Sequence, residues 1–289
     1  MSTVRVVKSI GIICKHDKPE AYDAARKLMS WLKRRGVESL LDPGAASHLN
    51  IPPTPVEKIA DKSDVIVVLG GDGTLLSVVR LVGEKGKPIV GVNLGTLGFI
   101  TSVPLGQLYP TMETVLSGQY KYQERMMLTA SVKRGGKVVE HHHVLNDIVI
   151  NKGALARIID LETSIDGKCL TTFKADGLII YTPTGSTGYS LSAGGPVVHP
   201  ILSCVGVTPI CPHTLTNRPL ILPDSASLEV TLMSENEDVF LTLDGQVGIK
   251  LQHKDVIEAR KSSSSMYFIM CPQEDYYKML RTKLKWGER

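Results

Sequence analysis

Several features that would assign this chain to a particular class of protein are scarce. Among its 289 residues, charged side chains make up 21% and aromatic side chains 5%. Lys and Arg number 33 against 29 Asp and Glu, a net charge of +4, and no extended Lys- or Arg-rich run occurs. A nucleic-acid-binding protein is expected to carry a stronger basic patch or more aromatic rings for base stacking. The mild positive charge instead suits small anionic molecules.

Cysteine is also sparse, and long apolar runs are missing. The cysteines are Cys14, Cys169, Cys204, Cys211 and Cys271. None forms a Cys-x-x-Cys pair, which favours reduced thiols and a cytoplasmic location. No stretch of about 18 apolar residues is present to cross a membrane, and the first residues lack the apolar core of a signal peptide. The adjacent histidines 141–143 alternate between the faces of a strand, so we expect no metal site there.

What the chain does have is a glycine-rich turn directly after an apolar strand. Val65–Leu69 predicts a buried strand, and Gly70-Gly71-Asp72-Gly73-Thr74 follows at once. Apolar residues then recur at helical spacing, which predicts a helix that begins at or near Thr74. A strand, a glycine-rich turn and a helix N-terminus direct backbone N–H groups at phosphate oxygens. The same turn could also be only a tight connection in an α/β sheet.

Asp72 lies inside this turn, where phosphates are expected. A carboxylate at that place repels phosphate unless it holds a metal ion or accepts a proton from a hydroxyl. The turn therefore favours phosphoryl chemistry over simple nucleotide binding.

The first part of the chain alternates predicted strands with helices. Strands are predicted at residues 10–14, 37–41, 65–69 and 88–93, and an amphipathic helix at 19–35. This alternation is typical of a parallel sheet covered by helices on both sides. Ligands of such sheets bind beyond the carboxyl ends of the strands, where Asp72 and the segment Asn93–Phe99 are expected to lie.

After about residue 124 the pattern changes to one rich in strands. Strands are predicted at residues 126–133, 138–150, 158–165, 178–181, 227–233, 239–243 and 266–270. We predict an α/β domain over residues 1–124, a β-rich domain over 125–272, and a partly helical tail over 273–289 that packs on the first domain. Ser262–Ser265 is most simply an exposed turn between strands.

Two polar segments of the β-rich part are candidate ligand sites. The predicted strand that ends at Tyr181 continues into Thr182–Ser190, a loop of hydroxyls and glycines that suits phosphate or ribose. Asn146 and Asp147 interrupt an apolar strand, and buried polar groups of this kind need partners. A ligand would supply those partners, although an Asn-Asp turn is the commoner explanation for such a pair.

Taken in order along the chain, these motifs resemble NAD kinases of the bacterial type, in the ATP-NAD kinase family. The segments that carry the resemblance are Gly70–Thr74, Asn146–Asp147, Thr182–Ser190, Leu191–Pro196, Cys211–Thr214 and Thr242–Gln246. The similarity extends from about residue 8 to residue 286. The glycine-rich turn alone is shared with lipid kinases and resembles phosphofructokinase, whereas the whole set is specific.

The resemblance implies both a fold and a reaction. The fold is an α/β N-terminal domain with a parallel sheet and a β-sandwich-like C-terminal domain, with NAD in the cleft. The reaction transfers the terminal phosphate of ATP to the 2′-hydroxyl of the adenosine ribose of NAD, giving NADP. It further implies a divalent ion, Mg²⁺, that accompanies ATP, and a homo-oligomer such as a dimer or tetramer.

The resemblance also assigns residues. Asp72 corresponds to the proton acceptor for the 2′-hydroxyl, and Gly70, Gly71, Gly73 and Thr74 to the phosphate-binding turn. Residues that match NAD contacts are Asp72, Gly73, Asn146, Asp147, Arg157, Lys174, Asp176, Thr187, Gly188, Tyr189, Ser190, Leu191, Ser192 and Gln246. Asp147 stands where the family often has Glu, and Lys174 replaces the arginine of some relatives.

Two other functions remain open at this point. A lipid or sugar kinase that shares the glycine-rich turn would also use an acid there, but it would not need the Thr182–Ser192 loop. A non-catalytic dinucleotide sensor would bind NAD without forming NADP. The sequence specifies neither the phosphoryl donor (ATP, another nucleoside triphosphate or polyphosphate) nor the choice between NAD and NADH.

Overall fold

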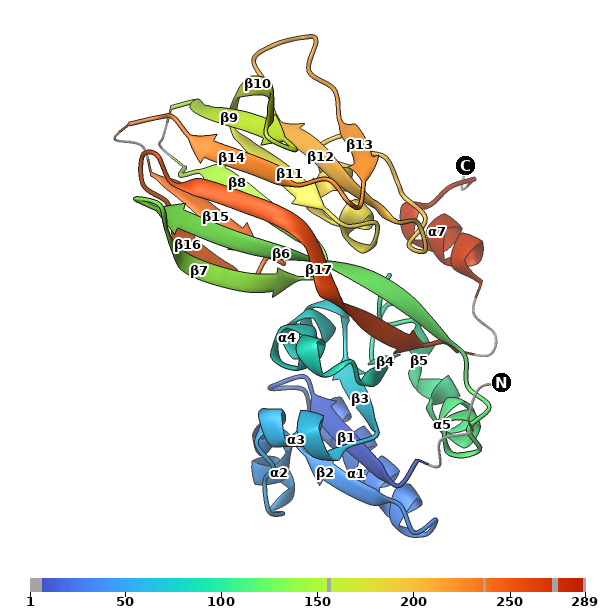
Figure 1. Ribbon diagram of the computed structural model, residues 1–289. Coiled ribbons are helices and arrows are strands. Elements are labelled where there is room, and N and C mark those ends of the chain that lie inside the picture. The colour runs from blue at the N-terminus through green and yellow to red at the C-terminus, as the bar shows by residue number, and fades with distance from the viewer. Residues whose placement is uncertain (1–6, 155–156, 236–237, 272–274, 288–289) are drawn as a thin grey trace. The chain divides into compact units, whose positions relative to one another are not determined.

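The structure, a computed structural model, describes residues 7–154, 157–235, 238–271 and 275–287 (Figure 1). The chain forms two compact units. Unit 1 contains the residues up to Glu124 together with those from Met266 onward, and unit 2 contains Arg125–Ser265. Unit 2 is thus inserted into unit 1 in the order of the sequence. No helix of the described residues is long and apolar enough to span a membrane.

Unit 1 is built on a parallel sheet. Its strands are β1 (Ser9–Cys14), β2 (Glu38–Leu41), β3 (Val65–Gly70), β4 (Pro88–Asn93) and β5 (Val103–Pro104). The order β2-β1-β3-β4 is parallel throughout, and β5 also pairs with β4 in parallel. All six residues of β1 and of β3 are buried, as expected for strands covered on both faces. The predicted parallel sheet is confirmed.

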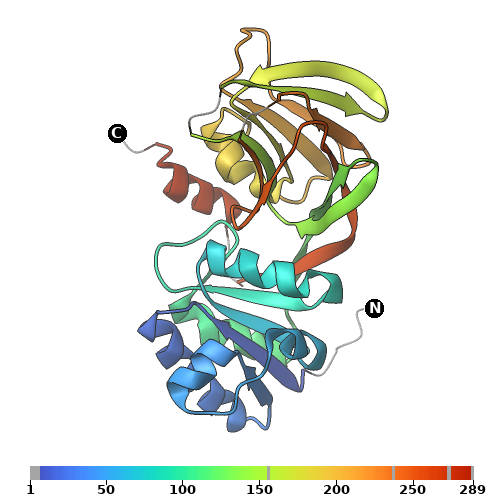
Figure 2. The same cartoon turned by 90° about the vertical axis from the view of Figure 1, so that its left-hand side faces the viewer.

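Helices cover both faces of this sheet (Figure 2). The helices that cover the sheet are α1 (Pro19–Lys33), α2 (Pro43–Leu49), α3 (Val56–Lys62), α4 (Asp72–Val82) and α5 (Leu108–Leu116). Unit 1 also contains α7 (Tyr276–Leu284) and the short 3₁₀ turns η1 (Gly83–Lys85) and η2 (Leu105–Gln107). Helices α1, α2 and α5 share one apolar core with the side chains of Ile10 and Ile12. On the other face, a Cβ atom on Gly11 would meet Ile59 of α3, and one on Gly91 would meet Leu75 of α4.

Helix α1 shows why the predicted pattern holds. Pro19 occupies its first turn, where the missing N–H costs nothing, and Gly36 follows its end with a φ of +69°. The buried residues are Ala21, Tyr22, Ala24, Ala25, Leu28, Trp31 and Leu32. They form one apolar face at helical spacing, so the predicted amphipathic helix is confirmed.

Unit 2 consists of two packed layers of strands. One layer contains β9 (Ile159–Ile165), β10 (Lys168–Ala175), β14 (Leu228–Leu232) and β17 (Val256–Ile269). In the same layer β6 (Tyr122–Arg134) pairs with β17, and β7 (Lys137–Val144) pairs with β6. The other contains β8 (Asp147–Lys152), β11 (Gly177–Tyr181), β12 (Cys204–Ile210), β13 (Leu220–Pro223), β15 (Val239–Leu243) and β16 (Val247–Lys250).

Apolar residues from both layers form one core between them. Leu161, Phe173 and Ile257 come from the first layer, and Ile148 and Leu241 come from the second. This is the packing of a β-sandwich, so the predicted fold class, an α/β domain followed by a β-rich one, is confirmed. The short turns η3 (Thr184–Thr187) and α6 (Tyr189–Ser192) follow β11.

Some local predictions were wrong. Residues 138–150 form not one strand but two, β7 and β8, separated by a bend at residues 145 and 146. Ser262–Ser265 lies inside β17 rather than in an exposed turn, and Ser262 is buried. The helix predicted to begin at or near Thr74 is confirmed, and α4 begins at Asp72, whose carboxylate in the first turn is favoured by the helix dipole. Of the predicted tail, residues 273, 274, 288 and 289 lie outside the described residues.

Candidate functional site

The glycine-rich turn of unit 1 has no room for a side chain at its start. A Cβ atom on Gly70 would lie 2.5 Å from the hydroxyl oxygen of Thr74, so glycine is required at that position. Gly71 is the N-cap residue of α4 and offers no side chain to cap it, and Cβ atoms on Gly71 and Gly73 would meet nothing. The start of α4 therefore presents an uncrowded helix N-terminus at the carboxyl end of β3.

The carboxylate of Asp72 is held by the segment that follows β4. Its Oδ2 accepts a hydrogen bond from the N–H of Phe99 at 2.8 Å. Its Oδ1 accepts from the N–H of Ile100 at 3.2 Å and from the N–H and hydroxyl of Thr101 at 2.8 and 2.7 Å. A Cβ atom on Gly98 would lie 2.0 Å from this Oδ1, so glycine allows the close approach. Three of these donors bond to Oδ1 and one to Oδ2, and together they fix the orientation of the carboxylate.

A buried pair of side chains supports this arrangement. Thr101 is fully buried, and its Oγ1 accepts a hydrogen bond from Nδ2 of Asn93 at 2.9 Å while donating to Asp72. Oδ1 of Asn93 in turn accepts from the N–H of Gly95 at 2.7 Å. Gly70 and Asn93 are register partners at the ends of β3 and β4. The expected meeting of Asp72 with the segment after Asn93 is confirmed.

In unit 2, the Asn146–Asp147 pair lies at a bend that the carboxylate of Asp244 organises. Its Oδ2 accepts from the N–H of Leu145 at 3.0 Å. Its Oδ1 accepts from the N–H groups of Asn146 and Asp147 at 2.6 and 3.2 Å. Asp244 and Gly245 have φ angles of +50° and +66°, the conformation of a tight hairpin turn, and they join β15 to β16.

Asp147 is a buried acid, with only 6% of its surface exposed. Burial first, and the neighbouring charge of Asp244 second, raise its pKa to about 7. The backbone N–H of Tyr189, which donates to Asp147, acts in the opposite direction. The carboxyl group of Asp147 can therefore change its protonation state near neutral pH.

The hydroxyl-rich loop after β11 uses much of its hydrogen-bonding capacity within unit 2. Thr182 Oγ1 donates to the carbonyl oxygen of Leu145 at 2.5 Å. Ser186 Oγ donates to the carbonyl oxygen of Pro183 at 2.7 Å and accepts from the N–H of Val198 at 3.0 Å. We predicted that the hydroxyls of this loop serve phosphate or ribose. For these two the prediction was wrong, because they hold the loop in place.

Other members of the loop leave polar atoms for a ligand. Tyr189 is exposed and begins α6. Thr187 Oγ1 donates to the carbonyl oxygen of Thr184 at 3.4 Å, and a hydroxyl that donates can still accept a hydrogen bond. Ser190 Oγ and Asn146 Oδ1 are buried atoms for which the described part of the chain supplies no hydrogen-bond partner. Buried polar atoms without partners are uncommon and are one mark of a functional site.

A pocket of about 440 Å³ brings part of the predicted set together. Asn146, Asp147, Gly188, Tyr189 and Asp244 are among the residues that line it. A volume of this size suits one nucleoside of a dinucleotide better than the whole molecule.

The remaining predicted residues of unit 2 do not line this pocket. Lys174 and Arg157 are exposed, and Asp176 lies 3.6 Å from the amino group of Lys152. Gln246 is exposed in the hairpin turn after Asp244. Leu191 and Ser192 close the short helix α6. Their roles as ligand contacts stay predictions.

Two residues of these networks were missed by sequence reasoning. Thr101 has no motif around it that marks a bond to Asp72, 29 positions away. Asp244 was covered only by the segment Thr242–Gln246 and was assigned no role of its own. The one available signal was its place between the apolar β15 and Gln246, within a segment that fits the family resemblance.

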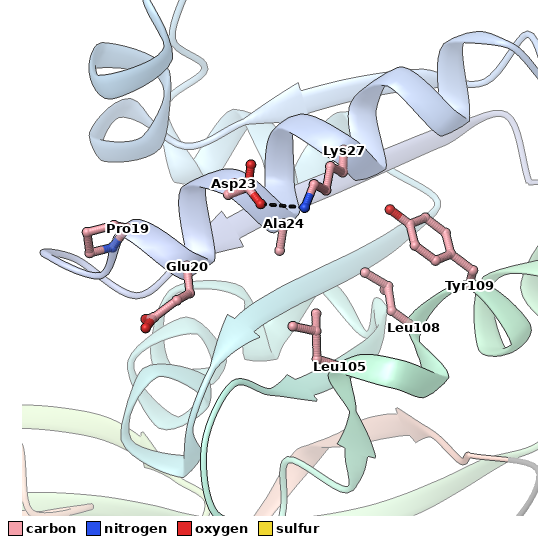
Figure 3. A pocket seen from close by; sticks show the side chains of 8 residues that line it. All are labelled: Pro19, Glu20, Asp23, Ala24, Lys27, Leu105, Leu108 and Tyr109. Atoms are coloured by element: carbon pink, nitrogen blue, oxygen red, sulfur yellow. Dashed lines mark ion pairs between the residues drawn. The ribbon is translucent and has the colours of Figure 1, made fainter.

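A separate hollow lies within unit 1, away from the predicted residues (Figure 3). It has a volume of about 520 Å³ between α1 and the start of α5. Leu105, Leu108 and Tyr109 line it on one side, and the ion pair between Asp23 and Lys27 of α1 lies on the other side (Figure 3). None of the residues predicted for the site is among those that line it.

Comparison with known proteins gives consistent matches along the chain. The family model of the ATP-NAD kinase N-terminal domain matches residues 10–120, and that of the ATP-NAD kinase C-terminal domain matches residues 145–271. An NAD kinase of Geotalea daltonii is 54% identical over 284 residues, which cover 98% of this chain and 100% of that protein. An NAD kinase of Geobacter sulfurreducens is 53% identical over 287 residues, with the same coverage of both chains.

Two solved structures are similar throughout. The yeast NADH kinase complexed with NADH has a TM-score of 0.90 and 29% identity, covering 99% of this chain and 89% of that one. An NAD kinase from Archaeoglobus fulgidus in complex with ATP has a TM-score of 0.75 and 25% identity, covering 96% and 98% of the two chains.

Proposed function

This chain belongs to the ATP-NAD kinase family, and from that premise we propose how its residues divide the work of the reaction. The protein is a kinase that phosphorylates NAD to NADP. The phosphate goes from ATP to the 2′-hydroxyl of the adenosine ribose in this proposal. Phosphoryl transfer depends on alignment and on neutralisation of charge more than on covalent help from the protein.

Asp72 accepts the proton of the ribose hydroxyl. The observation that carries this role is its position in the first turn of α4, where four hydrogen bonds fix its carboxylate at the end of β3. Among the described residues Oδ2 of Asp72 accepts only from the N–H of Phe99, so one acceptor site on this oxygen remains for the arriving hydroxyl. Proton acceptance of this kind typically raises the rate ~10²–10⁴-fold.

The glycine-rich turn holds phosphate. Gly70, Gly71, Gly73 and Thr74 surround the uncapped start of α4, where backbone N–H groups and the helix dipole favour anions. Such preorganised donors stabilise the charge that develops on the transferred group.

A divalent ion enters this proposal together with ATP. Asp72 is the carboxylate of the turn, and four N–H and hydroxyl donors already stabilise its charge without a cation. The chemistry of that donor set suits a hydroxyl substrate. Mg²⁺ is commonly bound through substrate phosphates with few protein ligands, and it would neutralise the charge of the triphosphate.

Unit 2 holds the dinucleotide through the pocket beside Asp147. Asn146 Oδ1 and Ser190 Oγ would find partners in the ribose or adenine groups of NAD. The exposed ring of Tyr189 offers a surface on which a base could stack. The proposal also includes the NAD contacts that the family resemblance assigns to four further residues, Arg157, Lys174, Asp176 and Gln246.

We propose further that the enzyme is cytoplasmic and assembles as a homo-oligomer. All five cysteines are free thiols, as expected in a reducing compartment. Ile201, Leu202 and Leu215 are large apolar side chains of unit 2 with 63%, 52% and 95% of their surface exposed. Exposed apolar residues of this size suit burial against a second copy of the chain.

The test is NADP formation by the purified protein with NAD, ATP and Mg²⁺. Asp72→Asn should retain the fold and lower kcat at least about 100-fold, because the amide cannot accept the proton. A near-normal kcat in the folded variant would refute the role of Asp72. Parallel reactions with polyphosphate, other nucleoside triphosphates and NADH determine the donor and the acceptor. NAD binding without NADP formation in all of them would favour a sensor, and phosphorylation of a lipid or sugar instead would favour another kinase.

A further inference from the structure

The side-chain carboxylate of Asp244 accepts hydrogen bonds from three consecutive backbone N–H groups. The donors are Leu145, Asn146 and Asp147, at 2.6–3.2 Å from its two carboxylate oxygens. The N–H of Asp244 also donates to the carbonyl oxygen of Asp147 at 2.9 Å, so the hairpin turn and the bend are joined in both directions. A row of N–H groups around one anion is a stable arrangement that fixes the backbone on both sides. The bend therefore depends on a residue almost a hundred positions away.

The same carboxylate lies beside the buried acid Asp147. The other groups around Asp147 come from two further elements. Tyr189 of α6 donates its N–H to it, and Tyr181 of β11 is its register partner. A Cβ atom on Gly188 would lie 3.5 Å from Oδ2 of Asp147, so the loop packs directly against it. Among these groups Asp244 carries the charge that acts on Asp147.

We propose that Asp244 is a positioning residue for dinucleotide binding: it shapes the Asn146–Asp147 bend and controls whether Asp147 meets a ribose hydroxyl as an acceptor or as a donor. This inference rests on the proposed function, in which the pocket beside Asp147 receives NAD. It adds a residue whose carboxylate is held by the backbone N–H groups of the bend and which acts through its neighbour.

The protonation of Asp147 decides the strength of that contact. An ionised carboxylate accepts hydrogen bonds from ribose hydroxyls, and bonds to a charged acceptor are stronger than those to a neutral one. The pKa of Asp147 is about 7, so NAD should bind more tightly as the pH rises from 6 to 8. Part of this raised pKa comes from the charge of Asp244, and the larger part comes from burial. Removing that charge should move the midpoint of the pH dependence to lower pH, because burial alone then remains.

The experiment measures NAD binding by calorimetry between pH 5.5 and 8.5, without ATP, because terminal phosphates titrate in the same range, near pH ~6. For the wild type, we expect Kd to fall at least about threefold across this range, with a midpoint near pH 7. In Asp244→Asn the midpoint should move down by about half a pH unit or more. Asp238→Asn is the matched control, because Asp238 is an exposed acid near the other end of β15. Its midpoint should equal that of the wild type.

A weaker affinity at every pH with an unmoved midpoint in folded Asp244→Asn would overturn the inference, because a purely structural role predicts that result. If Asp244→Asn does not fold, Asp147→Asn decides instead. It should bind NAD with no midpoint near pH 7, and the wild-type pH dependence in that variant would also overturn the inference. If the wild type forms NADP but the midpoint of Asp244→Asn equals that of the wild type, this inference alone is refuted. Wild-type protein that neither binds NAD nor forms NADP refutes the proposed function with it.

Discussion

Replacing Asp147 by Asn should stabilise the protein, by an amount that depends on pH. The ordinary pKa of an aspartate is 3.8, whereas that of Asp147 in the folded chain is about 7. Between these values the unfolded chain has released the proton and the folded chain still holds it. The contribution of Asp147 to stability is therefore fully present below about pH 3.8 and is lost as the pH rises through about 7.

The magnitude follows from the difference between the two pKa values. Each pKa unit corresponds to about 1.4 kcal/mol, and the difference is roughly three units, so the loss approaches about 4 kcal/mol above pH 8. Asn has nearly the same shape and does not titrate, and its amide oxygen can still accept from the N–H of Tyr189. Relative to the wild type, Asp147→Asn should therefore gain about 1.4 kcal/mol of stability per pH unit between pH 5 and 6.5, and level off above pH 8.

The assay is urea unfolding of both proteins, without nucleotides, at half-unit steps from pH 5 to 8.5. The quantity compared is the difference in free energy of unfolding at each pH, in which the other titrating groups cancel. A difference that stays flat from pH 5 to 8.5 would refute the reasoning. Asp23→Asn provides a flat control, because Lys27 and then Arg26 lower the pKa of Asp23 below its ordinary value of 3.8. Asp23 is then ionised in both the folded and the unfolded chain throughout the assay, so the stability of this variant relative to the wild type should not change between pH 5 and 8.5.

Two further substitutions test the networks of the two units. Thr101→Val keeps the shape but removes the bond to Asp72 and the acceptor for Asn93, so the free energy of unfolding should fall by about 2–4 kcal/mol. Thr101→Ser should restore most of this loss, and equal stability of the Val and Ser variants would argue against the bridge. Arg134 forms a bidentate ion pair with the fully buried Asp255, and Arg134→Met removes it. The free energy of unfolding in urea should fall by about 2 kcal/mol. Arg134→Lys, which keeps the charge, should lose less.

The pattern of apolar residues along the sequence was sufficient to predict the parallel sheet of unit 1. Strands buried on both faces, such as β3, are continuous apolar runs bounded by glycine or polar residues, and these are visible without any knowledge of the partners. The apolar face of α1 repeats at helical spacing for the same reason. The turn after β3 could be located because its glycines directly follow such a run.

Strands of unit 2 were harder to predict, because half of their residues face solvent. β10, β13 and β16 have exposed, mixed sequences, and no prediction was made for them. Ser262–Ser265 has the composition of a turn, but it lies within β17, where tertiary pairing outweighs local preference. Likewise, the bend at Asn146 is fixed by Asp244 rather than by its own residues.

The candidate site divides in a similar way. Asp72, Asn146 and Asp147 were identified because their residue types and motifs carry chemical meaning locally. The hydroxyls of Thr182 and Ser186 have the same local appearance but bond to the backbone, which depends on the packing of the loop. Thr101 and Asp244 act through contacts between distant segments, and a single sequence contains no signal for such pairs.

The insertion of unit 2 into unit 1 has a consequence for biosynthesis. The residues that complete unit 1, from Met266 onward, leave the ribosome only after all of Arg125–Ser265 has been made. At about 5–20 residues per second this delay is on the order of ten seconds. During that time the edge of β4 that later pairs with Tyr267 and Phe268 has no partner. The nascent chain must therefore carry an unfinished sheet while its inserted sandwich folds, and it is in this interval that the growing polypeptide has most need of a chaperone.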